Sequence, residues 1–159
     1  MEIRFFLQRD LPEVLDIEKR SYGHSWTERE FKAFLKDERS VGKVVIENGR
    51  VIGYLLYLLR PKAIDIYNIA VHPEERRRGV SRLLMTNLFT KFSQKRTRIN
   101  ALAAEKNLAA QLFFKAMGLK AIKIIHNAWE NSNETGYLFE IKEDQLEEKN
   151  EDLLERNAG

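Results

Sequence analysis

The sequence predicts an α/β domain built around a mixed β-sheet. Three observations support this: segments with strand periodicity alternate with segments of helix periodicity in the order βααβββαβαββ, an Asn-Gly dipeptide separates two of the strands, and 159 residues suffice for one domain with its own core. We find no internal repeat. The longest nearly apolar run, from Val51 to Leu59, is far shorter than the about 20 residues that span a bilayer.

The first part of the chain predicts a strand followed by two helices. Residues 2–8 alternate loosely between apolar and polar side chains, as a strand does. Asp10 is expected to cap a helix that runs to about Arg20. Thr27 lies three residues before Glu30, which is the spacing of a capping box, and therefore predicts the start of the second helix.

The rest of the chain predicts a hairpin and then alternating strands and helices. Strands are expected at 41–47 and 50–59, on either side of Asn48-Gly49, because this dipeptide tolerates the positive φ angles of a type I′ turn. The remaining expected elements are a strand at 63–71, a helix from Gly79 to about Ser93, a strand at 99–104, a helix from Asn107 closed by Gly118, and strands at 120–125 and 137–141.

Composition excludes several classes of protein. There are no cysteines, which excludes a disulfide framework, a thiol nucleophile and any metal site that needs thiolates. The three histidines, His24, His72 and His126, lie far apart without ligand spacing, so no metal site is expected. The chain begins with charged residues and lacks the pattern of a secretory signal, so a cytoplasmic protein without a membrane partner is predicted.

Charge is distributed unevenly along the chain. The net charge is +3, but residues 142–159 carry −4 and residues 1–141 carry +7. A basic body predicts an anionic partner, which on composition alone is a phosphate-bearing ligand, a nucleic acid or an acidic surface. The acidic end has Leu146, Leu153 and Leu154 at helical spacing and forms either a weak amphipathic helix or a solvated tail.

The turn before the helix at Gly79 is the segment most informative about chemistry. A helix N-terminus carries about half a positive charge and unpaired N–H groups, so a bare helix start disfavours nearby cations. Four arginines nevertheless gather there: Arg76, Arg77, Arg78 and Arg82. We expect the backbone amides of residues 77–82 to bind a phosphate or pyrophosphate, because such a ligand would give the arginines an anion to neutralise. The alternative is a solvated cationic turn.

Two motifs resemble the GNAT superfamily of acetyl-CoA-dependent N-acetyltransferases. Arg76-x-x-Gly79-x-Ser81 is similar to the family's Gln/Arg-x-x-Gly-x-Gly/Ala signature, with serine at the last small position. The segment from Asn107 to Leu119 resembles the family's Asn-x-x-Ala helix. Within the superfamily the chain looks most like the RimI branch of ribosomal-protein alanine N-acetyltransferases, through Ile17-Glu18, Ser25-Trp26-Thr27-Glu28 and residues 68–71.

The resemblance, which runs from Ile3 to Ile141, implies a GNAT fold over residues 1–142. This fold has a central mixed, mostly antiparallel sheet of about seven strands flanked by about four helices, and it leaves residues 143–159 as a charged acidic C-terminal tail or short helix. The resemblance also implies transfer of an acetyl group from acetyl-CoA to an amine. In RimI-like enzymes the amine is the N-terminal α-amine of a protein or peptide, such as a ribosomal protein. Whether the chain is a monomer or a dimer is left open.

The family binds acetyl-CoA with its central strand and the helix start that follows. By resemblance, the backbone of Ile69 and Val71 contacts the pantetheine arm, and the Val71 N–H faces the thioester oxygen as an oxyanion donor. The complete set of predicted acetyl-CoA contacts is Ile69, Ala70, Val71, Arg76, Arg77, Arg78, Gly79, Val80, Ser81, Arg82, Asn107 and Phe114.

The proton-handling residues of the RimI branch are missing. Its glutamate and tyrosine correspond to Leu102 and Phe114 here, and Glu105 would replace the glutamate only in a shifted register. Asp65 and Tyr67 share one face of the predicted central strand and are the candidate catalytic residues. The alternatives are a strand-end charge for Asp65 and a core aromatic ring for Tyr67.

A site without a base favours acceptor amines of low pKa. General acid–base assistance is worth about 10²–10⁴-fold, so its loss slows the reaction without abolishing it. An α-amine, with a pKa of about 7.7–8.0, is partly neutral near pH 7, whereas a lysine near 10.4 almost never is.

The alternative functions are acetylation of a small-molecule amine, acyl-CoA binding with little catalysis, and nucleic-acid binding, which rests on charge alone.

Overall fold

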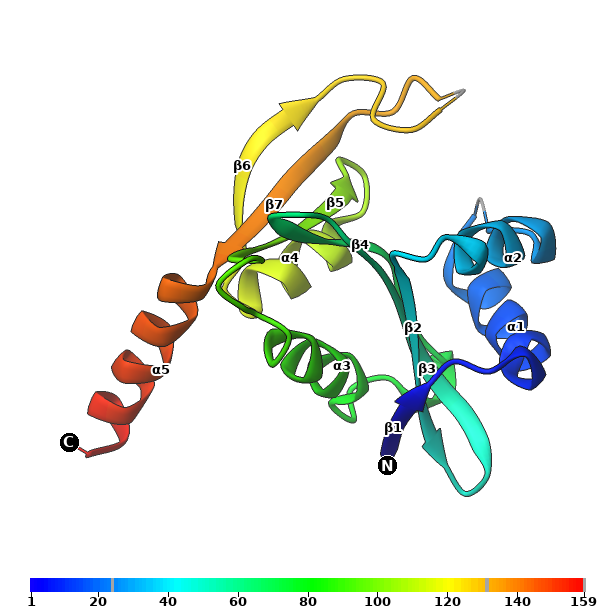
Figure 1. Cartoon of the computed structure of the whole chain (residues 1–159), viewed down its shortest axis with the longest axis horizontal. Coiled ribbons are helices and arrows are strands. Elements are labelled where there is room, and N and C mark those ends of the chain that lie inside the picture. The colour runs from blue at the N-terminus through cyan, green and yellow to red at the C-terminus, as the bar shows by residue number, and fades with distance from the viewer. Residues whose placement is uncertain (24, 131, 159) are drawn as a thin grey trace. The chain divides into compact units, whose positions relative to one another are not determined.

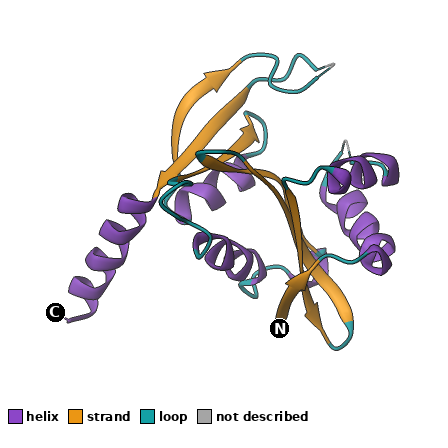
Figure 2. Ribbon diagram, in the orientation of Figure 1, coloured by secondary structure: helices purple, strands orange, loops and turns teal. Residues whose placement is uncertain are grey.

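The computed structural model describes residues 1–23, 25–130 and 132–158. The elements, shown in Figures 1 and 2, are β1 Glu2–Phe5, α1 Leu11–Ser21, α2 Glu28–Lys36, β2 Ser40–Glu47, β3 Arg50–Leu59, β4 Ala63–Val71, α3 Val80–Phe89, β5 Arg98–Ala104, α4 Leu108–Ala116, β6 Lys120–Ile125, β7 Gly136–Lys142 and α5 Glu143–Ala158. Short 3₁₀ turns at Gln8–Asp10 and Pro73–Glu75 precede α1 and α3. The strands form a seven-stranded sheet in the order β1-β2-β3-β4-β5-β7-β6.

The chain divides into two compact units. The first comprises Met1–Arg60 with Ile66–Lys91, and the second comprises Pro61–Asp65 with Phe92–Gly159. The boundary falls within β4, whose residues therefore belong to both units. Each unit is described separately below.

The first unit packs helices on both faces of its strands. β1 pairs antiparallel with β2, and β2 with β3. In Figure 1, α1 and α2 cover one face of β2 and β3, and α3 covers the other. A buried apolar cluster joins α1 and α2 to their face of the strands: Leu11, Val14, Ile17, Phe31, Val44, Val51, Tyr54, Leu56 and Ala70. On the opposite face Val80, Leu84, Met85 and Leu88 of α3 are buried.

Two predicted local signals are confirmed in this unit. Asn48 and Gly49 have φ angles of 51° and 75°, and β2 and β3 continue on either side in antiparallel register, as a type I′ hairpin requires. The Thr27 hydroxyl accepts a hydrogen bond from the Glu30 N–H at 3.2 Å and begins α2. Both features depend only on residues that are close in sequence.

Asp10 lies at the predicted N-cap position of α1, but its side chain does not cap the helix. α1 begins at Leu11, but the Asp10 carboxylate makes no capping bond to it. It accepts instead from the Leu7 N–H at 2.7 Å and pairs with both terminal nitrogens of Arg4 at 2.7 and 2.8 Å. Because the 3₁₀ turn begins after Leu7, β1 also ends earlier than the predicted residue 8.

The second unit packs α4 against β5, β7 and β6. β5 pairs antiparallel with β7, and β6 with β7. Phe114 of α4 is 4% exposed and stacks against Phe113 and Phe139, with ring centroids 5.7 Å apart in each case. Gly118, with a φ of 96°, ends α4 as predicted, because this left-handed conformation strains residues that have a Cβ.

One helix is shorter than predicted, and one alternative is decided. α3 ends at Phe89, before the predicted Ser93. Residues 143–158 form a fifth helix, α5, so the helix alternative for the acidic end is confirmed and the solvated tail is wrong. The Lys149 ammonium of α5 donates to the Ala116 carbonyl in the last turn of α4 at 2.7 Å, where a cation is favoured. The domain boundary at residue 142 stays a prediction. In the described part of the chain, no helix combines the length and apolar character that crossing a bilayer requires.

Candidate functional site

The loop between β4 and α3 adopts a backbone suited to anion binding. Arg77 has a φ of 64° and Gly79 a φ of 81°, so left-handed residues stand on both sides of Arg78. Gly79 precedes α3 and provides no side-chain cap, and the first helical bond is Leu83 N–H to Gly79 O at 2.9 Å. The N–H groups at the very start of α3 therefore have no acceptor within the helix and are available to a ligand anion.

Two of the four arginines around this loop form hydrogen bonds to other groups of the same chain. Arg78 donates to both carboxylate oxygens of Glu47 at 2.6 and 3.1 Å and also bonds to Glu75. These hydrogen bonds raise the pKa of Arg78 and lower that of Glu47. Arg76 turns back onto β4, with its Nε 3.3 Å from the Val71 carbonyl. Arg76 and Arg78 therefore have acceptors within the chain itself, and their predicted contacts with acetyl-CoA stay predictions.

Four further predicted contacts lie in this loop or in the first turn of α3. Arg77 and Arg82 are exposed, Ser81 is half-buried, and Val80 is 2% exposed. An added Cβ on Gly53 of β3 would lie 2.8 Å from Val80 Cγ1, so glycine permits α3 to begin directly against the sheet. The start of α3 is thus fixed by packing, while the two exposed arginines are positioned to meet solvent or ligand.

The predicted pantetheine strand carries side-chain hydrogen bonds on its backbone. The Ile69 carbonyl accepts from the Tyr22 hydroxyl, and the Val71 carbonyl accepts from Arg76. Burial and then the negative charge of Glu18 raise the pKa of Tyr22 to about 12, so its hydroxyl is a donor at neutral pH. No spacing in the sequence indicates the Tyr22 contact, because its two partners are 47 residues apart.

A buried carboxylate lies behind this contact. Glu18 of α1 is 1% exposed and accepts from the Asn68 amide at 2.9 Å, from the Trp26 N–H at 2.9 Å and from the Tyr54 hydroxyl. Burial and then Glu18 raise the pKa of Tyr54. A buried carboxylate with three donors is a stable arrangement, and it ties α1, the segment before α2, β3 and β4 together. In the sequence, Glu18 is marked only by the resemblance of Ile17-Glu18 to the RimI branch.

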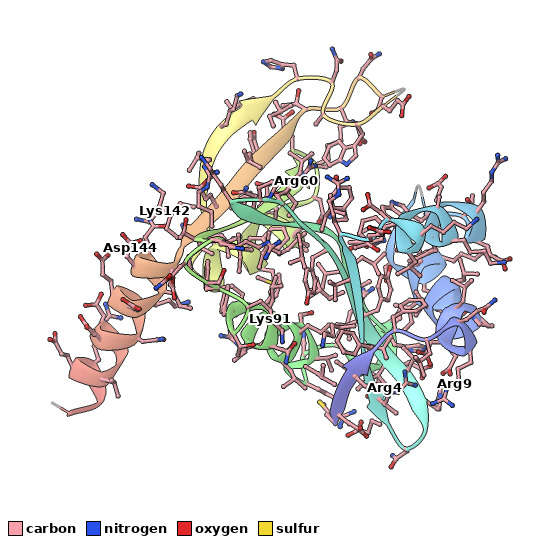
Figure 3. All side chains as sticks on the ribbon, viewed as in Figure 1. Arg4, Arg9, Arg60, Lys91, Lys142 and Asp144 are labelled. Carbon is pink, nitrogen blue, oxygen red and sulfur yellow. The ribbon has the colours of Figure 1, made fainter. Side chains whose placement is uncertain are left out.

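The candidate catalytic residues Asp65 and Tyr67 have different surroundings. Along β4, Asp65, Tyr67 and Ile69 are the less buried residues, which confirms that they share one face. Asp65 belongs to the second unit and accepts from the Asn100 amide at 3.3 Å. Tyr67 is 43% exposed, so the core alternative for its ring is wrong. Its hydroxyl accepts from Arg60, labelled in Figure 3, at 3.2 Å.

Asn107 and Phe114 lie in the second unit and have local roles there. The Asn107 side-chain oxygen accepts from the Ala110 N–H at 3.1 Å and caps α4. Phe114 is part of the aromatic core described above. Leu102 lies within β5 opposite Leu138, so the register places no carboxylate at this position. The predicted contacts of Asn107 and Phe114 with acetyl-CoA stay predictions.

Glu105 has a partner that sequence analysis missed. It is exposed beyond the end of β5, as expected for a loop carboxylate, and accepts from the Tyr137 hydroxyl of β7 at 3.3 Å. Burial and the charge of Glu105 raise the pKa of Tyr137. The pairing of β5 with β7 brings the two together across 32 residues, a separation that no local pattern reveals.

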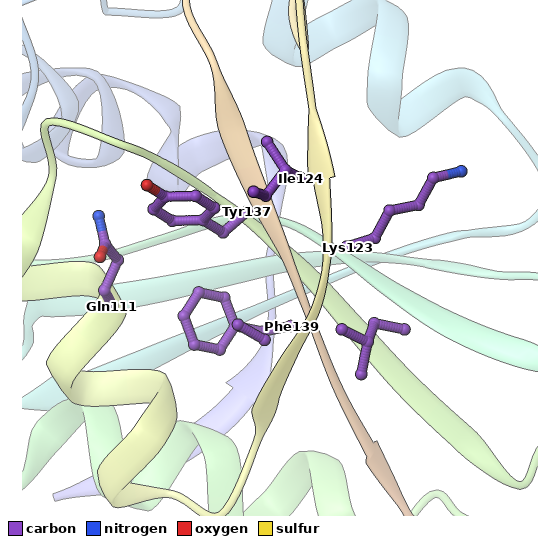
Figure 4. Close-up of a pocket in the computed structure, with 7 residues that line it drawn as sticks. Gln111, Lys123, Ile124, Tyr137 and Phe139 are labelled. Carbon is purple, nitrogen blue, oxygen red and sulfur yellow. The ribbon is translucent and has the colours of Figure 1, made fainter.

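A pocket of about 630 Å³ opens on the second unit (Figure 4). It lies between α4, β6 and β7 and is lined by Gln111, Ala121, Ile122, Lys123, Ile124, Tyr137 and Phe139. None of these residues is among the predicted acetyl-CoA contacts. His24 lies outside the described residues, and within the described ones no cluster of His, Cys, Asp and Glu side chains could hold a metal ion.

Comparisons with known proteins identify the family to which the chain belongs. The model of the acetyltransferase (GNAT) family matches residues 11–119. The ribosomal protein bS18-alanine N-acetyltransferase of Escherichia coli strain K12 is 26% identical over 119 residues, which cover 74% of this chain and 80% of that protein.

Solved structures confirm the predicted fold. The crystal structure of the ribosomal-protein-S18-alanine N-acetyltransferase from Escherichia coli has a TM-score of 0.78 at 22% identity, and the match covers 89% of this chain and 92% of that one. Arabidopsis thaliana NAA60 in complex with acetyl-CoA has a TM-score of 0.75 at 14% identity, with 90% and 98% covered.

Proposed function

The chain belongs to the acetyltransferase (GNAT) family, and from this premise we propose that the amine it acetylates is the N-terminal α-amine of a protein. As a member of the family it is an N-acetyltransferase that takes its acetyl group from acetyl-CoA. A ribosomal protein is the acceptor class we propose, since that is the acceptor named for the Escherichia coli relative. A cytoplasmic location is part of the proposal, because ribosomal proteins are made there.

One observation supports the acetyl-CoA site of the proposed enzyme above the others. The loop with left-handed Arg77 and Gly79 presents the uncapped start of α3, within the region that matches the family model. A diphosphate bound there gives the first N–H groups of the helix an acceptor and gives Arg77 and Arg82 a counter-ion. This assignment of the phosphate site is the part of the proposal that experiment must test first.

The reaction needs few groups from the protein. The neutral amine nitrogen attacks the thioester carbonyl carbon, a C–N bond forms, and the negative charge that develops on the oxygen meets the Val71 N–H. The C–S bond then breaks, coenzyme A leaves as a thiolate, and the new amide loses a proton to water. Leu102 and Phe114 offer no proton acceptor, so an amine that is already neutral near pH 7 reacts more readily.

An acceptor comparison tests the proposed substrate class. We expect coenzyme A release to be at least tenfold faster with a peptide whose N-terminus is free than with a peptide whose N-terminus is acetylated and whose only amine is an internal lysine. With polyamines, the rate of coenzyme A release should be lower still. Equal rates on the first two acceptors contradict the N-terminal assignment. Binding of acetyl-CoA without release on any acceptor supports instead an acyl-CoA-binding protein, which the residues Leu102 and Phe114 favour.

Reversing charge in the loop tests the phosphate site. We expect Arg77→Glu combined with Arg78→Glu to weaken acetyl-CoA binding by more than tenfold in calorimetric titration, because two cations beside the start of α3 become anions. Arg9→Glu combined with Arg29→Glu removes the same charge at exposed positions elsewhere in the first unit and should change affinity less than threefold. Equal affinity in the loop variant and the parent contradicts the site.

A further inference from the structure

The backbone groups of Ile69 and Val71 lie on the edge of β4 that faces away from β3. In a strand, alternate residues direct their N–H and C=O groups to opposite edges. Ala70 and His72 face β3, since the His72 N–H donates to the Ile52 carbonyl at 2.9 Å and the Ala70 oxygen lies 3.2 Å from where a Cβ on the β3 glycine would stand. Ile69 and Val71 therefore face the opposite edge.

Two side chains bond to this edge on either side of one N–H group. The Tyr22 hydroxyl donates to the Ile69 carbonyl, and Arg76 Nε donates to the Val71 carbonyl at 3.3 Å. These carbonyls belong to the two peptide groups that flank the peptide group of the Val71 N–H. Because both neighbouring planes are held, the direction of the N–H between them is fixed.

We propose that Tyr22 and Arg76 are positioning residues for acetyl transfer, which hold the Val71 N–H in the direction that meets the thioester oxygen. This inference rests on the proposed function and deepens it. Donors that are already oriented need no reorganisation when charge develops on the oxygen, and this orientation accounts for much of the value of an oxyanion site.

Both side chains are themselves fixed at the C-terminal turn of α1. Glu18, one turn before Tyr22, is bonded by the Asn68 amide at 2.9 Å, which ties this end of α1 to β4. A second nitrogen of Arg76 lies 3.3 Å from the Ser21 hydroxyl, which donates to the Ile17 carbonyl at 2.6 Å. The end of α1 thus positions the Tyr22 hydroxyl directly and supports the Arg76 guanidinium through Ser21.

This role gives Arg76 a different function from that of its neighbours. A phosphate-binding arginine lowers the Kd for acetyl-CoA, so its removal raises Kd and KM. An arginine that orients the Val71 N–H acts on the transition state, so its removal lowers kcat and leaves Kd almost unchanged. The same distinction applies to Tyr22, whose hydroxyl is already bonded to Ile69.

Kinetics of single variants give the first test. We expect Tyr22→Phe and Arg76→Gln each to lower kcat for coenzyme A release roughly tenfold, less than the about 10²–10³-fold caused by complete loss of an oxyanion donor. KM for acetyl-CoA should stay within twofold. Tyr57→Phe is the matched control: Tyr57 is 3% exposed on β3 and burial raises its pKa to about 12, whereas the side chains that donate to the Ile69 and Val71 carbonyls are those of Tyr22 and Arg76. Its kcat should stay within twofold of the parent.

An amide signal gives a second test that needs no acceptor. In the ¹⁵N-labelled full chain, the Val71 amide proton should shift downfield with acetyl-CoA relative to coenzyme A, because only the former has a thioester oxygen. We expect Tyr22→Phe and Arg76→Gln to reduce this difference by half or more. Ser21→Ala keeps both Tyr22 and Arg76 and removes only the hydroxyl that supports Arg76, so it is a milder variant if either of the other substitutions unfolds the chain. For Ser21→Ala we expect an intermediate reduction of the Val71 shift difference.

The outcomes separate the inference from the proposed function. A parent chain without the Val71 difference contradicts the proposed donor site itself. A parent that shows the difference, with variants that retain it in full or that keep the parent kcat, overturns the positioning role alone. A variant that raises KM for acetyl-CoA in proportion to its loss of kcat/KM also overturns it, since that pattern is ground-state binding.

Discussion

Asp10 acts through its ion pair with Arg4 rather than through α1. Burial alone would raise the pKa of Asp10, but hydrogen bonds from Arg4 and from the Leu7 N–H outweigh it, and the pKa is lowered. A carboxyl group with a lowered folded pKa adds stability above its unfolded pKa of about 3.9, and this stability is lost as pH falls through the lower, folded value. Asp10 therefore makes the fold sensitive to acid.

The substitution Asp10→Asn tests this role. We expect it to lower the free energy of unfolding by about 2 kcal/mol at neutral pH, as loss of hydrogen bonds to a charged group does. The gap between variant and parent in urea unfolding should narrow once pH falls below about 4, where the unfolded carboxyl binds its proton. Asp16→Asn, at a residue whose side chain is 50% exposed, should cost far less. An Asp10→Asn cost that is the same at every pH contradicts the assignment.

Among single residues, local features were predictable from the sequence and long-range hydrogen bonds were not. The Asn48-Gly49 turn, the Thr27 cap and the Gly118 stop were predictable because each depends on its immediate neighbours. The bonds from Arg4 to Asp10, from Arg78 to Glu47 and from Tyr22 to Ile69 were not. The last two join residues that are 31 and 47 positions apart in the sequence, respectively. Which of several arginines pairs with a carboxylate depends on the folded structure.

At the scale of elements, the start of α3 depends on a glycine in β3. A Cβ on Gly53 would lie 2.8 Å from Val80 Cγ1 and 3.2 Å from the Ala70 oxygen, so the helix or the strand must move to admit it. Val80 is β-branched, buried and the first residue of α3, and it has little freedom to turn away. Packing at one strand position thereby sets where the loop with Arg77 and Gly79 ends.

Gly53→Ala should therefore affect ligand binding as well as stability. We expect a loss of about 1–3 kcal/mol in the free energy of unfolding, as overpacking causes, and severalfold weaker acetyl-CoA binding by calorimetry because the start of α3 is displaced. Gly23→Ala is the control, since an added Cβ there meets nothing within 4 Å and no positive φ is involved. Unchanged affinity in Gly53→Ala would show that the helix start tolerates the displacement.

The elements themselves were predicted better than their ends. Every strand predicted from alternation is present, because alternation reports which face is buried. The end of α3 at Phe89 was not predicted, because it depends on where packing stops. For α5 the sequence left a helix and a solvated tail as alternatives, because the apolar pattern is weak within an acidic segment. In the loop before α3, glycine at position 79 readily adopts the observed φ of 81°, whereas no feature of the sequence indicates the positive φ of Arg77.

At the scale of the whole molecule, opposite charges are separated along the chain. The last 18 residues carry −4 against +7 for the rest, and several glutamates of α5 are exposed. A net charge of +3 attracts an anionic donor only weakly, and charges over the whole surface alter association rates at low salt. The acidic helix is therefore expected to slow the capture of acetyl-CoA.

Neutralising α5 tests this effect. Replacing Glu147, Glu148, Glu151 and Glu155 by glutamine raises the net charge from +3 to +7 without shortening the chain. We expect a two- to fivefold faster association of acetyl-CoA in stopped-flow measurements at 10 mM salt, where the Debye length is about 30 Å, and no difference at 1 M, where it is about 3 Å. An increase that persists at high salt points to a local contact rather than to net charge.

The bridge from Arg78 to Glu47 has one more consequence. Glu47 is the last residue of β2, beside the exposed hairpin tip, so the loop that precedes α3 is tethered to a distant bend of the chain. A protease that cleaved this bend would leave the covalent path of the loop intact and still release its anchor. Cleavage at the bend would thus change the loop before α3 through the Arg78 guanidinium group.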